Sequence, residues 1–318
     1  MRISGYVLAA LALATLAGCH RDHRRVIAVI PKGSSHLYWQ SVHAGAAKAG
    51  KELNVDIVWD GPPGETDYAG QLQIIDAMIN RHVDAIALAP IDRTAMVSAV
   101  DRAATQHIPV IIFDSAVDTN SYVSMVATDN YKAGQLGAER LAKILGGKGK
   151  VAMVKVQPGA ASTEAREKGF EDVMAKEYPD IHIVDARFGM ADVAKSLTVS
   201  ENILTAHPDL DGIFASNESS TMGAVQALKS RHGEHVKLVG FDWSPALAGD
   251  LKSGLIDSLV VQDPFKMGYL SVVTAIDKLN GKTVPKSQPL PARIVDRNNM
   301  NDPDVQAQIN PDMKQYLQ

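Results

Sequence analysis

The chain has 318 residues with a formal net charge of −4, and 46% of its residues are hydrophobic. This composition can bury ordinary cores, and the absence of a basic stripe argues against a nucleic-acid partner. At about 150 residues per domain, the length predicts two domains.

The N-terminus indicates a targeting segment. Arg2 gives a positive start, and residues 6–17 form a nearly continuous apolar run that suits a signal-peptide core and is too short to span a bilayer. The run ends in Leu16-Ala17-Gly18-Cys19, which resembles a bacterial lipobox. Cys19 is the only cysteine, so it cannot form an internal disulfide. We expect a lipoprotein signal peptide over residues 1–18, lipidation of Cys19 and a tether over residues 19–25. The protein would then be anchored on the periplasmic or cell-surface side of a membrane.

Short apolar strands alternate with helical segments from Val26 onward. The pattern predicts strands at 26–30, 55–59, 85–89 and 110–113, and helices at 39–53, 68–81 and 94–106. Strands separated by helices of about 12–15 residues are typical of βαβ units and of a parallel sheet covered on both faces.

The alternation then restarts with a second set of elements. It predicts helices at 132–145, 164–177, 192–206, 221–229, 246–252 and 266–279, and strands at 151–156, 181–185, 212–215, 236–241 and 257–261. We expect the remainder to be a loosely structured tail with one strand at 292–295. Two successive sets predict an α/β fold of two doubly wound parallel-sheet lobes.

Polar and aromatic side chains follow the predicted strands directly, where ligands bind in open α/β sheets. The candidates are His36, Tyr38, Trp39, Asp114, Asn217, Asp242 and Gln262. Carboxylates and amides can each pair with adjacent hydroxyls, and aromatic faces suit the C–H side of a sugar ring. The set predicts a site for a neutral polyol. Structural roles stay open, because the polar residues can equally cap helices or turns and one aromatic ring can pack into its helix.

Several short stretches together resemble the type I periplasmic sugar-binding proteins, the substrate-binding proteins of ABC importers. They are residues 110–114 (VIIFD), 127–130 (ATDN), 166–170 (REKGF), 204–209 (LTAHPD), 213–217 (IFASN) and 239–242 (VGFD). The resemblance runs from residue 26 to about 295. It implies two lobes joined by three hinge crossings, near residues 129, 262–264 and 284–289. The first lobe would comprise 26–128 plus 264–284, and the second 129–263 plus the tail, 285–318.

The resemblance also implies site roles. Asp114, Asn217, Asp242 and Gln262 match positions that contact sugar hydroxyls, and the two aromatics match a pair that lies against the ring. The chain departs from the ribose binders at three positions, with Ala89 in place of Asn, and Ser115 and Glu164 in place of Arg. We therefore add Glu164 and Arg166 to the candidates and expect a monosaccharide or similar small polyol other than ribose.

The predicted function is capture of this ligand by hinge closure and its delivery to permease subunits, by a monomer without cofactor or metal. The alternative is a sensory protein that presents a sugar to a membrane receptor or kinase. An enzyme is disfavoured: residues 146–150 (GGKGK) lie between helix and strand, the wrong order for a phosphate loop, and His232 and His235 suggest only half a metal site. A transcription regulator would need a helix-turn-helix before Val26.

Overall fold

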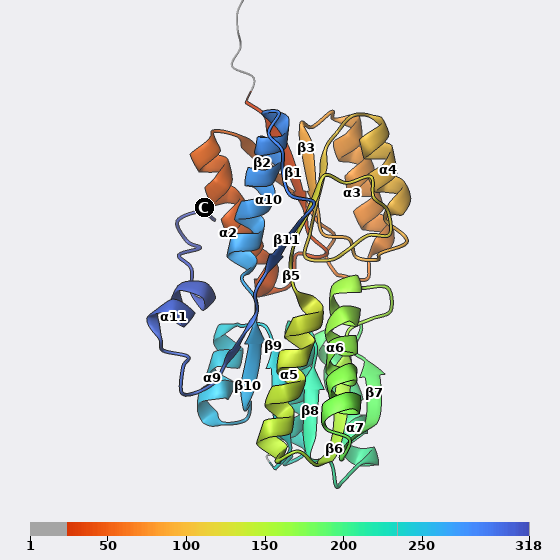
Figure 1. Ribbon diagram of the computed structural model, residues 1–318, viewed down its shortest axis with the longest axis vertical. Coiled ribbons are helices and arrows are strands. Elements are labelled where there is room, and N and C mark those ends of the chain that lie inside the picture. Colours follow the sequence, from red (N-terminus) through yellow and green to blue (C-terminus); the bar gives the residue numbers. More distant parts are fainter. Residues whose placement is uncertain (1–23, 234, 318) are drawn as a thin grey trace, which may run out of the picture.

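The computed structural model describes residues 24–233 and 235–317, which form two lobes stacked along the long axis (Figure 1). Each lobe is built on a six-stranded sheet with helices on both faces. This confirms the predicted α/β fold of two doubly wound lobes. Leaving residue 234 aside, no helix between residues 24 and 317 is long and apolar enough to cross a membrane. The predicted signal peptide, Cys19 and most of the tether lie outside the described residues.

The first lobe has an all-parallel sheet in the order β11-β5-β4-β3-β1-β2. Its strands are β1 (Val26–Ile30), β2 (Asp56–Trp59), β3 (Ala85–Leu88), β4 (Val110–Phe113), β5 (Ser124–Thr128) and β11 (Ser287–Leu290). One face packs against α2 (Leu37–Leu53) and α10 (Pro264–Leu279), and the other against α3 (Tyr68–Asn80) and α4 (Val97–Thr105).

The second lobe repeats this plan in the order β12-β10-β9-β8-β6-β7. Its strands are β6 (Gly149–Lys155), β7 (Ile181–Phe188), β8 (Gly212–Ala215), β9 (Lys237–Phe241), β10 (Ser258–Val261) and β12 (Arg293–Val295). Only the edge strand β12 runs antiparallel in the described part of this sheet. One face packs against α5 (Asn130–Leu145) and α6 (Ala161–Glu177). The other packs against α7 (Val193–Ala206), α8 (Glu218–Ser230), α9 (Pro245–Ser253) and α11 (Pro303–Ile309).

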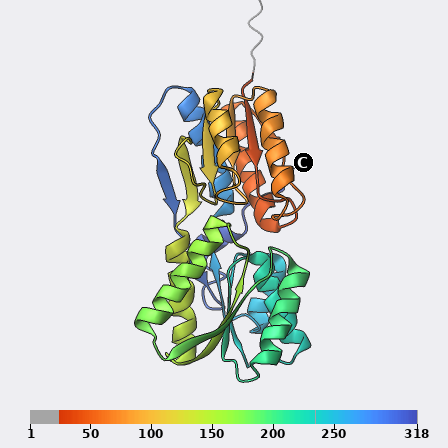
Figure 2. The same ribbon diagram turned by 90° about the vertical axis from the view of Figure 1, so that its right-hand side faces the viewer.

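Glycines bring two pairs of helices into backbone contact. A Cβ added to Gly45 of α2 would lie 1.9 Å from the carbonyl oxygen of Phe265 in α10, and one added to Gly134 of α5 would lie 1.9 Å from that of Arg166 in α6. No side chain fits at such distances. The close packing fixes α2 and α6, whose N-termini face the other lobe (Figure 2).

Three connections join the lobes, at residues 128–130, 261–264 and 290–293. The first two agree with the expected crossings. The third lies later than the expected 284–289, because β11 pairs with β5 and belongs to the first lobe rather than the second. Pro289 obscured this strand, since proline is tolerated only at a sheet edge such as β11. The tail is also more ordered than expected, because α11 buries Val305 and Ile309 in the second lobe.

Candidate functional site

A narrow cavity lies between the lobes, at the carboxyl ends of both sheets. Its walls are Lys32, His36, Tyr38, Trp39, Glu65, Asp114, Ser162, Thr163, Arg166, Asn217, Glu218, Asp242 and Gln262. Eight of the nine residues predicted to bind ligand are among them. Both lobes contribute, so the cavity depends on their arrangement.

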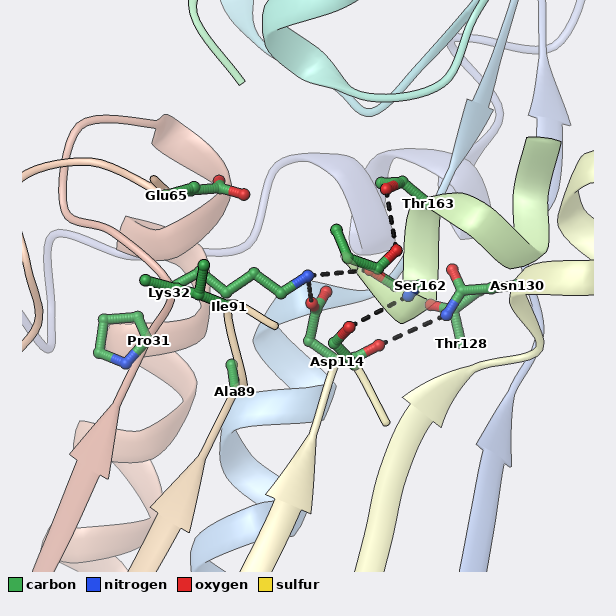
Figure 3. A network of polar contacts seen from close by, with 12 residues as sticks. Pro31, Lys32, Glu65, Ala89, Ile91, Asp114, Thr128, Asn130, Ser162 and Thr163 are labelled. Carbon is green, nitrogen blue, oxygen red and sulfur yellow. Dashed lines mark hydrogen bonds and ion pairs between the residues drawn. The ribbon is translucent and has the colours of Figure 1, made fainter. Parts of the chain in front are cut away.

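Asp114 provides a carboxylate from the first lobe. It follows β4 with a φ of 60°, a left-handed conformation that aspartate adopts more readily than most residues. Its Oδ1 accepts a hydrogen bond from the Tyr38 hydroxyl at 2.8 Å. Its Oδ2 lies 2.7 Å from the Lys32 ammonium (Figure 3). Burial and the negative charge of Asp114 raise the pKa of Tyr38 well above its ordinary value. Tyr38 therefore stays a neutral donor.

Asp242 provides the matching carboxylate from the second lobe, after β9 and with a φ of 70°. Its Oδ1 accepts from Gln262 Nε2 at 2.7 Å, and its Oδ2 from the backbone amide of Glu218 at 2.9 Å. Gln262 Oε1 in turn accepts from the Thr128 hydroxyl at 2.7 Å, which ties the aspartate to the hinge. Burial raises the pKa of Asp242 despite the nearby Arg166 charge. Each aspartate retains acceptor capacity, since a carboxylate can accept about four hydrogen bonds.

His36, Glu65 and Trp39 form a second polar group. Glu65 Oε1 lies 3.0 Å from His36 Nδ1 and accepts from Trp39 Nε1 at 2.9 Å. Burial alone would lower the pKa of His36, but the hydrogen bond and charge of Glu65 outweigh it and raise the pKa to about 9. Burial would likewise raise the pKa of Glu65, yet the His36 interaction lowers it to about 2. The pair is therefore an ion pair at neutral pH.

The side chain of Glu218, in the second lobe, reaches helix α2 of the first lobe. It stands at the N-terminus of α8, and its Oε2 accepts from the backbone amide of Tyr38, in the first turn of α2, at 3.2 Å. Burial and the charge of Asp242 raise the pKa of Glu218 to about 7. Its charge therefore changes near neutral pH.

Arg166 and Asn217 combine structural and cavity roles. Arg166 donates from Nε to Asn130 Oδ1 at 2.8 Å and from Nη1 to the Ser216 carbonyl at 3.0 Å, and its guanidinium lies 4.2 Å from the centre of the Phe241 ring. Asn217 caps α8 by accepting from the Ser220 amide at 2.9 Å. Capping and lining the cavity are thus compatible for Asn217.

Several hydrogen bonds cross the cleft and hold the lobes together. Lys32 Nζ donates to Ser162 Oγ at 2.9 Å (Figure 3), and Gln157 Nε2 donates to the Glu65 carbonyl at 2.8 Å. At the rim, the Arg93 amide donates to the Gly159 carbonyl at 3.0 Å. The structure is therefore a closed arrangement, in which both halves of the polar set face one volume.

Glu164 lies outside the cavity, unlike the other eight predicted residues. Its Oε1 accepts from the Gly159 amide at 2.8 Å, and its Oε2 is 3.9 Å from Arg93 Nη1 at the rim. The helix α6 begins three residues earlier than predicted, at Ala161. It therefore presents Ser162 and Thr163 to the cavity and turns Glu164 away from it.

Five lining residues were missed by the sequence prediction: Lys32, Glu65, Ser162, Thr163 and Glu218. All follow strands at the same sheet edges as the predicted residues. Glu65 stands in the loop after β2, and the two hydroxyl residues lie beyond β6. That position after a strand was the available signal. In the part of the chain that the structure describes, no group of three or more His, Cys, Asp or Glu side chains is placed to hold a metal ion.

Comparisons with known proteins agree with this geometry. A family model described as a periplasmic binding protein domain matches residues 27–283. The ribose import binding protein of Bacillus subtilis is 30% identical over 257 residues, covering 81% of this chain and 82% of that protein. The D-ribose/D-allose-binding protein of Pseudomonas aeruginosa is 31% identical over 267 residues, covering 81% and 83%.

Solved structures show the same likeness. A carbohydrate transporter solute-binding protein from Agrobacterium radiobacter, in complex with D-arabinose, is 35% identical with a TM-score of 0.88, covering 91% of this chain and 99% of that one. An ABC transporter solute-binding protein from Agrobacterium vitis, with bound D-fucose, is 33% identical with a TM-score of 0.86, covering 89% and 99%. These relatives are binding proteins rather than enzymes, as the sequence predicted for this chain.

Proposed function

Because this chain belongs to the periplasmic binding protein family, we propose that it binds a monosaccharide or similar small polyol between its lobes and delivers it to an ABC importer. Relatives that bind ribose, allose, arabinose and fucose support a sugar as the ligand. The permease subunits are the proposed partners.

One observation carries the proposal: both lobes direct carboxylate, amide and cationic side chains into a single small cavity. In the closed arrangement these groups leave a free volume of only about 20 Å³, so the lobes must separate for a ligand to enter between them. Hydrogen bonds from hydroxyls to an ionised carboxylate contribute roughly 1.5–3 kcal/mol each, against about 1 kcal/mol for neutral pairs. Asp114 and Asp242 therefore make strong anchors on opposite walls.

The proposed ligand contacts are the eight predicted residues that line the cavity together with five others. They are His36, Tyr38, Trp39, Asp114, Arg166, Asn217, Asp242 and Gln262, joined by Lys32, Glu65, Ser162, Thr163 and Glu218. Glu164 is left out. Tyr38 and Trp39 are packed edge to face with ring centroids 4.9 Å apart, and we assign them to the apolar side of the sugar ring.

Closure around the ligand supplies the mechanism. A ligand shifts a conformational equilibrium only by its differential affinity for the two states. In the closed arrangement it would touch Asp114 and Asp242 at once, whereas separated lobes offer it one aspartate at a time. Sugar binding therefore favours closure, and the closed form is the one proposed to dock on the permease.

We also propose the predicted anchor: a signal peptide over residues 1–18, lipidation of Cys19 and a monomer tethered by residues 19–25 on the periplasmic or cell-surface side. The amino end of β1 supports this assignment, because the cavity lies at the opposite, carboxyl end of the strand. An anchor there leaves the cleft accessible. In a bacterial host, Cys19→Ala should move the protein from the membrane fraction to the soluble one. If Cys19→Ala leaves the protein in the membrane fraction, the proposed lipid anchor is contradicted, and the sugar-binding proposal is unaffected.

The sugar proposal is tested by a thermal-shift screen of D-arabinose, D-fucose, D-tagatose, D-ribose and D-allose. Binding at a hundredfold excess over Kd adds about 2.7 kcal/mol to the free energy of unfolding, which is readily seen as a rise in Tm. We expect at least one aldose or ketose to produce it. A folded protein whose Tm none of these sugars or other small polyols changes would contradict the proposal.

A further inference from the structure

The charges that line the cavity between the lobes do not balance. Its walls hold four carboxylates and three cationic side chains. The carboxylates are those of Glu65, Asp114, Glu218 and Asp242, and the cations are Lys32, His36 and Arg166. With every group ionised, the cavity carries one excess negative charge. Because burying a charge without a partner is costly, the excess belongs to the carboxylate whose partners compensate it least.

Two of the four carboxylates form ion pairs within the first lobe. Asp114 Oδ2 lies 2.7 Å from Lys32 Nζ, and both side chains are almost completely buried (Figure 3). Glu65 Oε1 lies 3.0 Å from His36 Nδ1. These two pairs use two of the three cations, and they are complete without a ligand.

The third cation, Arg166, compensates the carboxylate of Asp242 in the second lobe. Burial raises the pKa of Asp242, and the positive charge of Arg166 acts against that rise. Asp242 also accepts a hydrogen bond with each of its oxygens, from Gln262 Nε2 and from the backbone amide of Glu218. Three of the four carboxylates are therefore supported by a cation.

Glu218 is the carboxylate left without an ion pair among the described residues. It is only 4% exposed, and within the described part of the chain the Tyr38 amide alone donates to its carboxylate, at 3.2 Å from Oε2. Burial and the charge of Asp242 raise its pKa to about 7, and His36, whose charge opposes the rise, is already paired with Glu65. Its Oε1 thus remains available to a ligand.

We propose that the ligand carries an ammonium group, which pairs with Glu218, so that the preferred ligand is an amino sugar or another small polyol with one amine. The inference rests on the proposed function, because it names the ligand class of the same cavity. Neutral hydroxyls can donate to Glu218, but they leave its charge uncompensated when the lobes close around it. A ligand ammonium removes that imbalance.

The position of Glu218 also links the ammonium to closure. Its Oε2 accepts from the Tyr38 amide, in the first turn of α2 and across the cleft. An ionised carboxylate is the better partner for the N-terminus of a helix. A ligand ammonium that keeps Glu218 ionised therefore strengthens a contact that exists only between closed lobes.

The test compares sugars that differ in a single amine. Isothermal titration calorimetry at pH 7 measures Kd for D-glucosamine, D-galactosamine, D-mannosamine and kanosamine, each beside its parent hexose. We expect at least one amino sugar to bind at least tenfold more tightly than its parent. In Glu218→Gln, which removes the charge and keeps an acceptor for the Tyr38 amide, this preference should fall at least fivefold. Glu139→Gln is the matched control, because Glu139 is exposed on α5, and it should leave the preference unchanged.

The outcomes separate this inference from the sugar proposal. If neutral sugars bind and no amino sugar binds more tightly than its parent, the ammonium inference is overturned and the sugar proposal stands. If the preference persists in Glu218→Gln, another group binds the ammonium, and the assignment to Glu218 is overturned. If the folded protein binds neither class of sugar, both proposals fail. Thermal unfolding checks that each variant is folded; should Glu218→Gln not fold, the comparison in the unaltered protein still decides the ligand class.

Discussion

Replacing Asp242 by asparagine isolates the contribution of its charge to ligand binding. Asparagine tolerates the left-handed backbone that this position requires, so Asp242→Asn avoids the strain that Asp242→Ala would add. The amide offers one acceptor oxygen instead of two, and its nitrogen cannot accept from Gln262 or from the Glu218 amide. The exchange therefore alters the site with little change to the fold.

The magnitude follows from the bonds at this carboxylate. Each of its oxygens already accepts one internal hydrogen bond, which leaves room for about two sugar hydroxyls. Converting two charge-assisted bonds to neutral ones loses about 1 kcal/mol each. The total of about 2 kcal/mol corresponds to roughly a 30-fold rise in Kd.

Isothermal titration calorimetry with the sugar that raises Tm most provides the assay. Asp192→Asn is the matched control, because Asp192 caps α7 away from the cavity and asparagine caps helices equally well. The variant has a second consequence, since the charge of Asp242 helps to raise the pKa of Glu218. Its removal should lower that pKa. A Kd within twofold of the unaltered protein, or an equal loss in the control, would refute the reasoning.

Three further predictions address packing, closure and pH. Gly268→Ala places a Cβ 2.0 Å from the carbonyl oxygen of Val42 and should cost about 1–3 kcal/mol in urea unfolding. An added Cβ at Gly249 meets nothing within 4 Å, so Gly249→Ala should raise the free energy of unfolding by about 0.5–1 kcal/mol. A change of the same sign in Gly268→Ala and Gly249→Ala would contradict the close packing of α2 against α10. Gly159→Ala strains a backbone with a φ of 83° at the carbonyl that accepts from the Arg93 amide across the cleft, and should keep X-ray scattering profiles open at sugar concentrations that close the unaltered protein. Because the pKa of Glu218 is raised from 4.5 to about 7, the closed form should be favoured at low pH and lose that stabilisation as pH rises through 7. Glu218→Gln should make closure, measured by X-ray scattering, less dependent on pH. If closure depends on pH as strongly in this variant as in the unaltered protein, groups other than Glu218 cause the dependence.

The sequence predicted the lobes because apolar runs of strand length recur between amphipathic segments. It missed β5 and β11 for physical reasons. Polar residues dilute β5, and β11 contains Pro289 and gains its pairing from a strand more than 150 residues earlier in the chain. No local pattern records such a pairing. The helix α11 was also missed. It has only seven residues, and its contact with the second lobe stabilises it.

The candidate site was predictable where one rule sufficed, namely that ligand-binding side chains follow strands. Asp114, Asn217 and Asp242 satisfied it directly. Glu164 lies outside the cavity, because the first turn of α6 decides which residue faces the cleft and that helix begins three residues earlier than predicted. Nothing near Lys32 in the sequence marked it as a site residue, because a buried lysine needs a partner and its partner Asp114 lies 82 residues away in the chain.

The two lobes have matching strand orders, and in each an aspartate in the left-handed conformation follows the fourth strand. A sugar has no matching pair of halves, so the polar residues of each lobe must bind a different pattern of hydroxyls. The two aspartates are held differently, Asp114 by a lysine and a tyrosine and Asp242 by amide groups. One half can thus change its preference while the other retains the ligand, which gives such a lineage a stepwise route from one monosaccharide to another.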